Sequence, residues 1–174
     1  MVDDVTRLAL AARDGDADSA NTFVRVTQAE VWRLAAALAG REVADDVTQE
    51  TYLRAFRALP WFEARSTART WLLGIARHVC VDHVRAAVRR RRLDAEMSPD
   101  DGAGAPDPCG TLAAMDLLRR LPGERRVAFV LTQVLGLSYA EAAGVEGVPI
   151  GTIRSRVARA RADLVAAVEQ AYAL

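Results

Sequence analysis

Apolar residues recur along most of the chain at the three- and four-residue spacing of an α-helix. An early example would end at Gly40 and bury one face made of Phe23, Val31, Leu34, Ala35 and Leu38. No stretch alternates apolar and polar residues as a half-buried strand does, and no long repeat is present. The pattern therefore predicts an all-α protein.

The helical pattern is interrupted once, at residues 97–110, by the run MSPDDGAGAPDPCG. Proline, glycine and aspartate without apolar periodicity are typical of a linker. We therefore expect two small helical domains, residues 1–92 and residues 112–174, joined by a flexible acidic linker over residues 93–111. A chain of 174 residues is long enough for two domains at the lower end of the size range.

The C-terminal part carries the signals of a helix-turn-helix. Ser138 and Glu141 have the spacing of a capping box, which starts a short helix. Gly147 supplies a turn, and Pro149 suits the first position of a second helix. Helix, glycine turn and helix in this order predict a helix-turn-helix.

The second of these helices has two different faces. An apolar stripe faces the expected core and consists of Ile153, Val157, Ala160, Leu164 and Val168. The opposite face is polar and basic, and consists of Thr152, Ser155, Arg156 and Arg159, with Arg154 and Arg161 on its flanks. Arginines that begin at a helix N-terminus suit insertion into a DNA major groove, where they contact guanine. The alternative is a merely solvated face, but only Asp163 lies near enough in sequence to pair with these arginines.

The N-terminal part contains an amphipathic helix over residues 42–60. Its expected buried side consists of Thr48, Tyr52, Ala55, Phe56 and Leu59. Asp46, Glu50, Arg54 and Arg57 point away from that side, with Leu53 among them and Gln49 at the edge. A leucine surrounded by both signs of charge suits a protein contact better than DNA, whereas the helix pattern by itself favours a solvated face.

A loop over residues 60–68 precedes a long helix. The helix has a core side of Leu72, Ile75, Ala76, Val79 and Ala86, and another side of Thr70, Arg77, His78, Val81 and Arg85, flanked by Trp71 and Arg89. Arginines interleaved with Trp61, Phe62 and Trp71 beside a polar loop favour single-stranded nucleic acid, whose bases stack on aromatic rings. Each aromatic ring taken alone is more often part of a core.

Charge is segregated along the chain although the net charge is zero. Residues 65–92 hold eight arginines and the single acid Asp82, whereas residues 93–111 hold five acids and no base. All 23 basic residues are arginine, whose planar donor fork suits phosphate and base edges. Blocks of opposite charge indicate separate surfaces for different partners.

The chemistry of an enzyme is missing from the sequence. The run HVCVDH, residues 78–83, places His78 and Asp82 on one helix face and Cys80 on another, and no second cluster completes a metal site. We expect neither catalysis nor a cofactor nor a metal. The two cysteines, the acidic N-terminus and the lack of a membrane-spanning apolar run favour a cytoplasmic protein that does not bind membranes.

Three stretches together resemble the extracytoplasmic-function (ECF, group IV) sigma factors of bacterial RNA polymerase, in the order and spacing of that family. They are ADDVTQETYLRAF (residues 44–56), RSTARTWLLGIARHVCVDHVR (residues 65–85) and GLSYAEAAGVEGVPIGTIRSRVARAR (residues 136–161). A helix-turn-helix alone is common, but its combination with the other two motifs is highly specific. The resemblance implies a specificity subunit that binds the −35 duplex and the melted −10 non-template strand of a promoter.

The resemblance also implies roles for individual residues. Those that would dock on the clamp helices of the polymerase's largest subunit are Asp45, Asp46, Gln49, Glu50, Leu53 and Arg54. Those that would bind the −10 single strand, with a flipped base in the loop, are Trp61, Phe62, Arg65, Ser66, Thr67, Arg69, Trp71, Arg77 and His78. Those that would read the −35 element are Thr152, Arg154, Ser155, Arg156 and Arg159. The acidic linker would pass towards the active-site cleft of the polymerase.

The sequence departs from the family pattern at a few positions. His78 stands where the family usually has asparagine, and Ala142, Gly144 and Glu146 replace bulkier or more apolar residues. We therefore expect weak packing of the first helix of the C-terminal motif. Many members of the family are held inactive by an anti-sigma factor, although no motif here marks such an interface. The alternative function is a stand-alone helix-turn-helix regulator of duplex DNA, for which no dimerisation element is evident.

Overall fold

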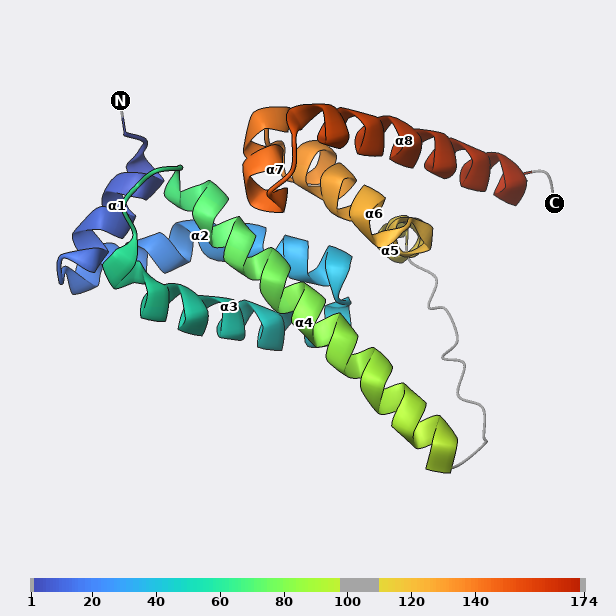
Figure 1. Cartoon of the computed structure of the whole chain (residues 1–174), viewed down its shortest axis with the longest axis horizontal. Coiled ribbons are helices and arrows are strands. Elements are labelled where there is room, and N and C mark those ends of the chain that lie inside the picture. Colours follow the sequence, from blue (N-terminus) through green and yellow to red (C-terminus); the bar gives the residue numbers. More distant parts are fainter. Residues whose placement is uncertain (1, 98–109, 173–174) are drawn as a thin grey trace.

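The computed structural model describes residues 2–97 and 110–172 of the chain, and these residues form α-helices joined by short turns. The N-terminal half contains α1 (Asp4–Arg13), α2 (Ala17–Leu38), α3 (Ala44–Ala58) and α4 (Ala68–Met97). Short 3₁₀ turns at Arg41–Val43 and Leu59–Trp61 bracket α3. In Figure 1, α2, α3 and α4 lie together, and α4 extends well beyond the other two.

The C-terminal half contains α5 (Gly110–Arg120), α6 (Gly123–Phe129), α7 (Tyr139–Glu146) and α8 (Ile150–Tyr172). A π-helical turn, Val130–Val134, follows α6 directly. Helices α6 and α7 each pack on α8, and α7 and α8 form the expected helix-turn-helix. An all-α fold with a helix-turn-helix in its C-terminal half is confirmed, whereas the expected linker falls largely on residues 98–109, outside the described residues.

Local signals in the sequence explain where the helices begin and end. The side chain of Asp3 accepts a hydrogen bond from the Thr6 backbone N–H at 3.0 Å, which caps α1. Ser138 and Glu141 form the complete capping box of α7. Gly147 ends α7 with a φ of 67°, a left-handed conformation that favours glycine, and so turns the chain into α8.

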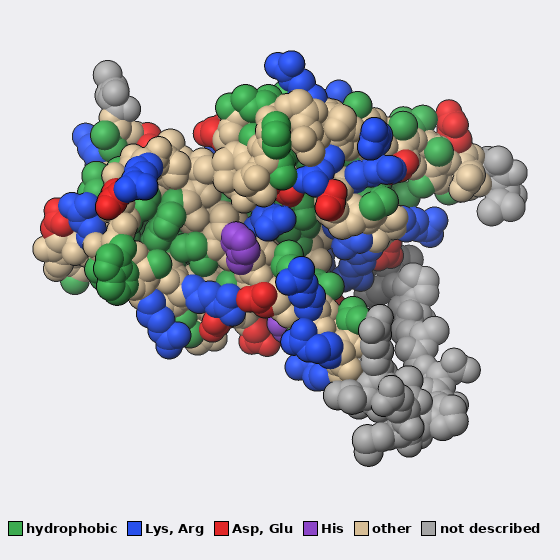
Figure 2. Space-filling model, in the orientation of Figure 1, with side chains coloured by type: hydrophobic (Ala, Val, Ile, Leu, Met, Phe, Trp, Pro, Cys, Tyr) green, Lys and Arg blue, Asp and Glu red, His purple; other side chains and the backbone are tan. Residues whose placement is uncertain are grey.

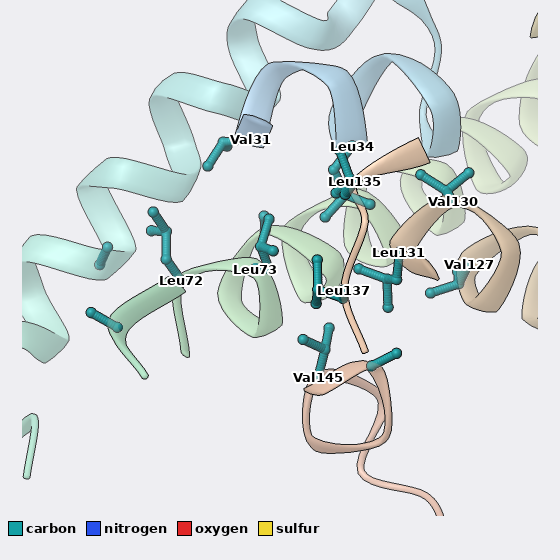
Figure 3. Packing of buried hydrophobic residues seen from close by; sticks show 14 of the residues in the cluster. Val31, Leu34, Leu72, Leu73, Val127, Val130, Leu131, Leu135, Leu137 and Val145 are labelled. Carbon is teal, nitrogen blue, oxygen red and sulfur yellow. The ribbon is translucent and has the colours of Figure 1, made fainter. Parts of the chain in front are cut away.

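One hydrophobic core extends through both halves of the chain. It includes Leu34 and Leu73 of the N-terminal half together with Leu131, Leu135 and Leu137 of the C-terminal half. Figure 3 shows side chains of α2 and α4 directed towards the π-helical turn and the loop before α7. Helices α4 and α7 are in contact, as are α2 and α6. The two halves are therefore packed against each other.

This packing explains two differences from the sequence expectation for α4. Leu73 and Cys80 are each 1% exposed, although neither was expected on the core side. Leu73 belongs to the core shared with the C-terminal half, and Cys80 packs against α2 and α3 residues that include Ala36 and Val47. A helix covered on two faces has no single apolar stripe, so its periodicity reveals only one of them.

Two other expected core residues are exposed. Phe56 of α3 is 39% exposed, so its assignment to the buried side was wrong. On α8, Ile153, Val157 and Ala160 are buried, but Val168 is 36% exposed. The last turns of α8 extend past α6 (Figure 1).

Candidate nucleic-acid and protein interfaces

The outer face of α3 borders an apolar groove. Asp45, Asp46 and Gln49 are exposed, and Leu53 is 48% exposed. Arg54 donates hydrogen bonds of 2.8 Å to Glu50 on its own helix and 2.8 Å to Asp82 on α4. These bonds raise the pKa of the Arg54 guanidinium and, because Asp82 accepts one of them, lower the pKa of the Asp82 carboxyl. The predicted docking residues thus form one charged surface around an exposed leucine.

The groove extends this surface onto α2, which the sequence did not predict. It has a volume of about 440 Å³ and is lined by Val24, Gln28, Trp32, Asp45, Thr48, Gln49, Tyr52, Leu53 and Phe56. The Trp32 indole N–H donates to Asp45 at 2.8 Å, which joins the two helices at the groove. The unexpectedly exposed Phe56 lies here. Apolar residues surrounded by charge are typical of a protein interface.

The loop between α3 and α4 forms a shallow pocket. Its volume is about 370 Å³, and it is lined by Trp61, Phe62, Glu63, Arg65, Ser66 and Trp71. Trp61 is 77% exposed, and the Arg65 side chain is 86% exposed beside Glu63. A free indole face and a hydroxyl at the same pocket can stack on a base and hydrogen-bond to its edge.

Two of the predicted single-strand contacts are instead structural supports of this pocket. Phe62 is 4% exposed and packs on Trp71 with ring centroids 4.8 Å apart, so Phe62 is not itself available for stacking. The Thr67 hydroxyl accepts from the Thr70 backbone N–H at 3.1 Å and so caps the start of α4. Trp61, Arg65 and Ser66 remain accessible, as does His78, whose ring bonds to the Gly74 carbonyl at 2.7 Å.

Arg69 and Arg77, also predicted to bind the single strand, are covered by the C-terminal half. Arg69 donates to the Leu135 backbone carbonyl at 2.7 Å and is paired with Glu30 of α2. Arg77 has 24% of its side chain exposed, and its Nε lies 3.7 Å from the Glu146 carboxylate of α7. Sequence reasoning placed both arginines on an open face, because it did not foresee that α7 packs there.

The exposed face of α8 contains most of the predicted duplex contacts. Arg154, Ser155 and Arg159 are exposed, and Thr152 is partly exposed one turn earlier. The Ser155 hydroxyl donates to the Thr152 carbonyl at 2.9 Å. This face begins at the N-terminus of the second helix of the motif and can present arginines to a polyanion.

Arg156 is placed differently from the expectation. Only 15% of its side chain is exposed, and it forms ion pairs with Glu146 of α7 at 2.7 Å and with Glu124 of α6 at 2.6 Å. Both carboxylates are distant in sequence, so a count of neighbouring acids missed them. Arg156 therefore joins α6, α7 and α8, and lies at the edge of the basic face rather than at its centre.

The helix α7 is well packed, contrary to the expectation of weak packing. Ala142 is fully buried, and the Glu146 side chain is 1% exposed. Burial raises the pKa of the Glu146 carboxyl, while the positive charges of Arg77 and Arg156 lower it. The small residues of this helix allow close approach: a Cβ on Gly144 would lie 3.4 Å from the Thr70 methyl of α4.

Basic side chains also gather on the distal part of α4. Arg85, Arg89 and Arg90 are exposed there, and Figure 2 shows the basic side chains over this part of the helix. This arginine row lies on the helix that begins at the loop pocket, several turns further along, and it can attract the phosphates of a polyanion that extends beyond the pocket.

Cys80 is expected to be unreactive in the folded protein. Burial raises the pKa of its thiol to about 12, so very little thiolate exists at pH 8. In a Cys109→Ser variant, a thiol reagent at pH 8 should label Cys80 only after denaturant is added. Rapid labelling of the native variant would show that α4 separates from α2 and α3 on the reaction timescale.

No group of three or more metal-ligating side chains occurs among the side chains that the structure describes, those of residues 2–90 and 115–171. Among the described helices, none combines the length and apolar character that crossing a bilayer requires.

Comparison with known families identifies both halves of the chain. The family model described as Sigma-70 region 2 matches residues 23–90, and the model described as Sigma-70, region 4 matches residues 111–164. The first range contains the α3 groove and the loop pocket, and the second contains the helix-turn-helix. The groove and the pocket thus belong to one region, and the helix-turn-helix to another region, of one class of protein, the sigma-70 factors.

Relatives narrow the class further. The chain is 48% identical over 172 residues to "ECF RNA polymerase sigma factor SigC" of Mycobacterium tuberculosis, covering 95% of this chain and 91% of the relative. It is 31% identical over 179 residues to "ECF RNA polymerase sigma-E factor" of Haemophilus influenzae, covering 92% and 94%. The chain belongs to the ECF family of RNA polymerase sigma factors.

Two solved structures have a similar arrangement of helices. CnrH in complex with the cytosolic domain of CnrY superposes with a TM-score of 0.76 at 28% identity, covering 96% of this chain and 99% of that chain. RpoE in complex with the anti-sigma factor NepR, from Bartonella quintana, gives a TM-score of 0.73 at 26% identity, covering 86% and 96%. Both matches extend over the N-terminal and the C-terminal half.

Proposed function

We propose that this sigma factor directs RNA polymerase to its promoters through three separate surfaces. The domain of residues 1–92 docks on the polymerase and binds the melted −10 strand. The domain of residues 112–174 reads the −35 duplex, and the acidic segment of residues 93–111 connects them inside the polymerase. The protein acts as an initiation factor rather than as a catalyst, in the cytoplasm with the polymerase.

The polymerase contact is the groove between α2 and α3. Asp45 and Gln49 line it beside Leu53 and Phe56, which are 48% and 39% exposed, and Asp46 and Glu50 add negative charge on the same helix. A partner helix with apolar residues and complementary charge, such as a clamp helix of the largest subunit, suits this combination.

The −10 contact is the loop pocket with its exposed Trp61 and Ser66, and the −35 contact is the exposed face of α8. The observation that carries the proposal is that one chain, matched to sigma-70 regions 2 and 4, presents a pocket suited to an unpaired base and an arginine helix suited to a duplex. A stand-alone regulator of duplex DNA needs neither the pocket nor the α3 groove.

Reconstitution with core polymerase tests this function directly. We expect transcription from a promoter that carries the cognate −35 and −10 elements, and no specific initiation by the core alone. A protein that binds duplex DNA but supports no initiation with core polymerase would instead be the stand-alone regulator.

Anti-sigma binding is a further expected partnership, since the two solved neighbours are sigma factors in complexes with NepR and with CnrY. The close match to both folds supports a similar partner for this chain. Gel filtration with a candidate partner would detect the complex.

Loss of one exposed arginine of α8 should weaken duplex binding. We expect Arg159→Ala to cost about 1–3 kcal/mol in binding to a −35-only duplex and to relax preference at one base pair. Fluorescence anisotropy with the cognate and singly substituted duplexes measures both effects. Arg156→Ala serves as the comparison. The Arg156 guanidinium is already paired with Glu146 and Glu124, so the loss of Arg156 should lower the melting temperature more than Arg159→Ala does. Unchanged duplex affinity in Arg159→Ala would remove Arg159 from the reading face.

A further inference from the structure

Helix α1 contacts both ends of the loop that forms the proposed −10 pocket. The loop leaves the 3₁₀ turn Leu59–Trp61 and enters α4, and Figure 1 shows it passing beside α1. Contacts join α1 to this 3₁₀ turn and to α4. Helix α1 precedes residues 23–90, the range that matches Sigma-70 region 2, so the loop is supported by residues outside the matched range.

The first anchor fixes the start of the loop. Arg13, the last residue of α1, donates a hydrogen bond from Nη1 to the Phe62 backbone carbonyl at 3.1 Å. The Arg13 Nε–H donates to the carboxylate of the neighbouring Asp14 at 2.8 Å, and this second bond orients the guanidinium. Because the Phe62 ring packs on Trp71 inside the pocket wall, the anchor holds a residue that shapes the pocket.

The second anchor fixes the end of the loop. The Thr6 hydroxyl accepts a buried hydrogen bond from the Ala68 backbone N–H at 2.8 Å. Thr6 donates its own hydroxyl proton to the Asp3 carboxylate at 2.6 Å, so the hydroxyl oxygen is free to accept from α4. Ala68 is the first residue of α4, where a backbone N–H cannot bond within its own helix. A side chain of α1 therefore caps α4 from 62 positions away in the sequence.

The loop between the two anchors has little backbone support of its own. Within the described part of the chain, the backbone N–H groups of residues 63–66 donate no hydrogen bond to another backbone group. Ala64 has a φ of 53°, a left-handed conformation that is unfavourable for a residue with a Cβ. Such a conformation persists only where the surrounding structure enforces it. The hydrogen bonds from α1 to residues 62 and 68 are constraints of this kind.

We propose that Arg13 and Thr6 are positioning residues for −10 recognition, which hold the loop in the shape that receives an unpaired base. This inference rests on the proposed function, in which the pocket of Trp61 and Ser66 is the −10 contact. A loop that already has its bound shape loses less conformational freedom when it binds. The two anchors therefore raise the affinity for the −10 strand without contacting it.

Arg13→Met tests the first anchor, because it removes the donor and keeps an unbranched side chain. With the holoenzyme, we expect about tenfold weaker binding of a labelled −10 non-template oligonucleotide by fluorescence anisotropy, since affinity follows the fraction of loops in the binding shape. Arg13→Lys keeps a charged donor and should recover most of the affinity. Arg7→Met is the matched control, because Arg7 carries the same charge on α1 but is 67% exposed and paired with Asp4. An equal loss in both methionine variants would be a charge effect and would overturn this anchor.

Thr6→Val and Thr6→Ser test the second anchor. Valine keeps the shape of the side chain without the hydroxyl, so the Ala68 N–H is left buried without its partner, whereas serine keeps the hydroxyl. In the same anisotropy assay, we expect only Thr6→Val to weaken binding of the −10 oligonucleotide, and both variants to bind a −35-only duplex normally. Equal affinity of the two variants for the −10 oligonucleotide would overturn the second anchor.

A double-mutant cycle with Trp61→Ala separates positioning of the loop from general destabilisation. If Arg13 acts through the pocket, Arg13→Met should weaken oligonucleotide binding less than about threefold in the Trp61→Ala background, because the stacking surface that it positions is already absent. A full tenfold loss in that background, or unchanged affinity of Arg13→Met alone, would overturn the positioning role and leave the proposed function intact. If instead Trp61→Ala by itself leaves oligonucleotide binding unchanged, the proposed −10 pocket fails, and the positioning role fails with it.

Discussion

Asp46→Arg or Glu50→Arg is expected to abolish stable assembly with core polymerase. Both residues are neighbours in sequence of Asp45 and Gln49, which line the apolar groove; Asp46 is exposed and Glu50 is partly exposed. Reversing a charge at a charged interface removes an attraction and adds a repulsion, which costs about 2–5 kcal/mol when the pair is buried. Co-purification with tagged core polymerase, followed by promoter-dependent transcription, measures the loss.

Glu169→Arg is the matched control, because it makes the same charge change at an exposed position on α8, away from the groove. Its assembly should be unchanged. Circular dichroism should show the same helicity in all three variants, since none of the substitutions enters the core. If Asp46→Arg and Glu50→Arg both assemble as well as the control, the polymerase binds elsewhere and the α3 groove has another partner.

Trp61→Ala is expected to impair promoter opening while duplex recognition is retained. Trp61 is 77% exposed at the loop pocket, whereas the neighbouring Phe62 and Trp71 pack on each other. Stacking of a base on an aromatic ring contributes about 1–3 kcal/mol, which corresponds to a roughly 5- to 150-fold loss of open complex. Permanganate footprinting of unpaired thymines in the −10 region measures the open complex, and anisotropy with a −35-only duplex measures recognition.

Trp61→Phe is the informative control, since it keeps an aromatic face and should retain much of the opening activity. Ser66→Ala should change base preference within the −10 element more than the amount of open complex, because it removes a polar contact rather than a stacking surface. A Trp61→Ala variant that opens promoters normally, or that loses −35 affinity instead, would contradict the proposed division between the loop pocket and α8.

Much of the secondary structure follows from local signals in the sequence. The capping box of Ser138 and Glu141 and the left-handed turn at Gly147 place α7 and the start of α8 from a few neighbouring residues. Hydrogen bonds over three or four residues decide these features, so no knowledge of the rest of the fold is needed. The motifs that resemble ECF sigma factors are equally local, and the family comparison confirms the resemblance.

Burial on each helix was harder to predict. Phe56 was expected in the core and is exposed at the groove, whereas Phe62 was expected at the surface and is buried against Trp71. Helical periodicity identifies one apolar face of α3 but not which large residues at its edge are covered, and it says nothing of Phe62, which lies in the loop after the helix. That choice depends on how α2, α3 and α4 cross, which is a property of the assembled bundle.

The sequence by itself determined the helices, the helix-turn-helix, the separation of charge and the three motif-bearing segments, because each depends on residues close together in the chain. The tertiary structure decided which charges meet. It brought Glu124 and Glu146 to Arg156. On α4, it brought the Leu135 backbone carbonyl to Arg69 and the Glu146 carboxylate to Arg77. Such contacts join residues from 10 to 69 positions apart, and they form only where packing of the shared apolar core brings the two halves together.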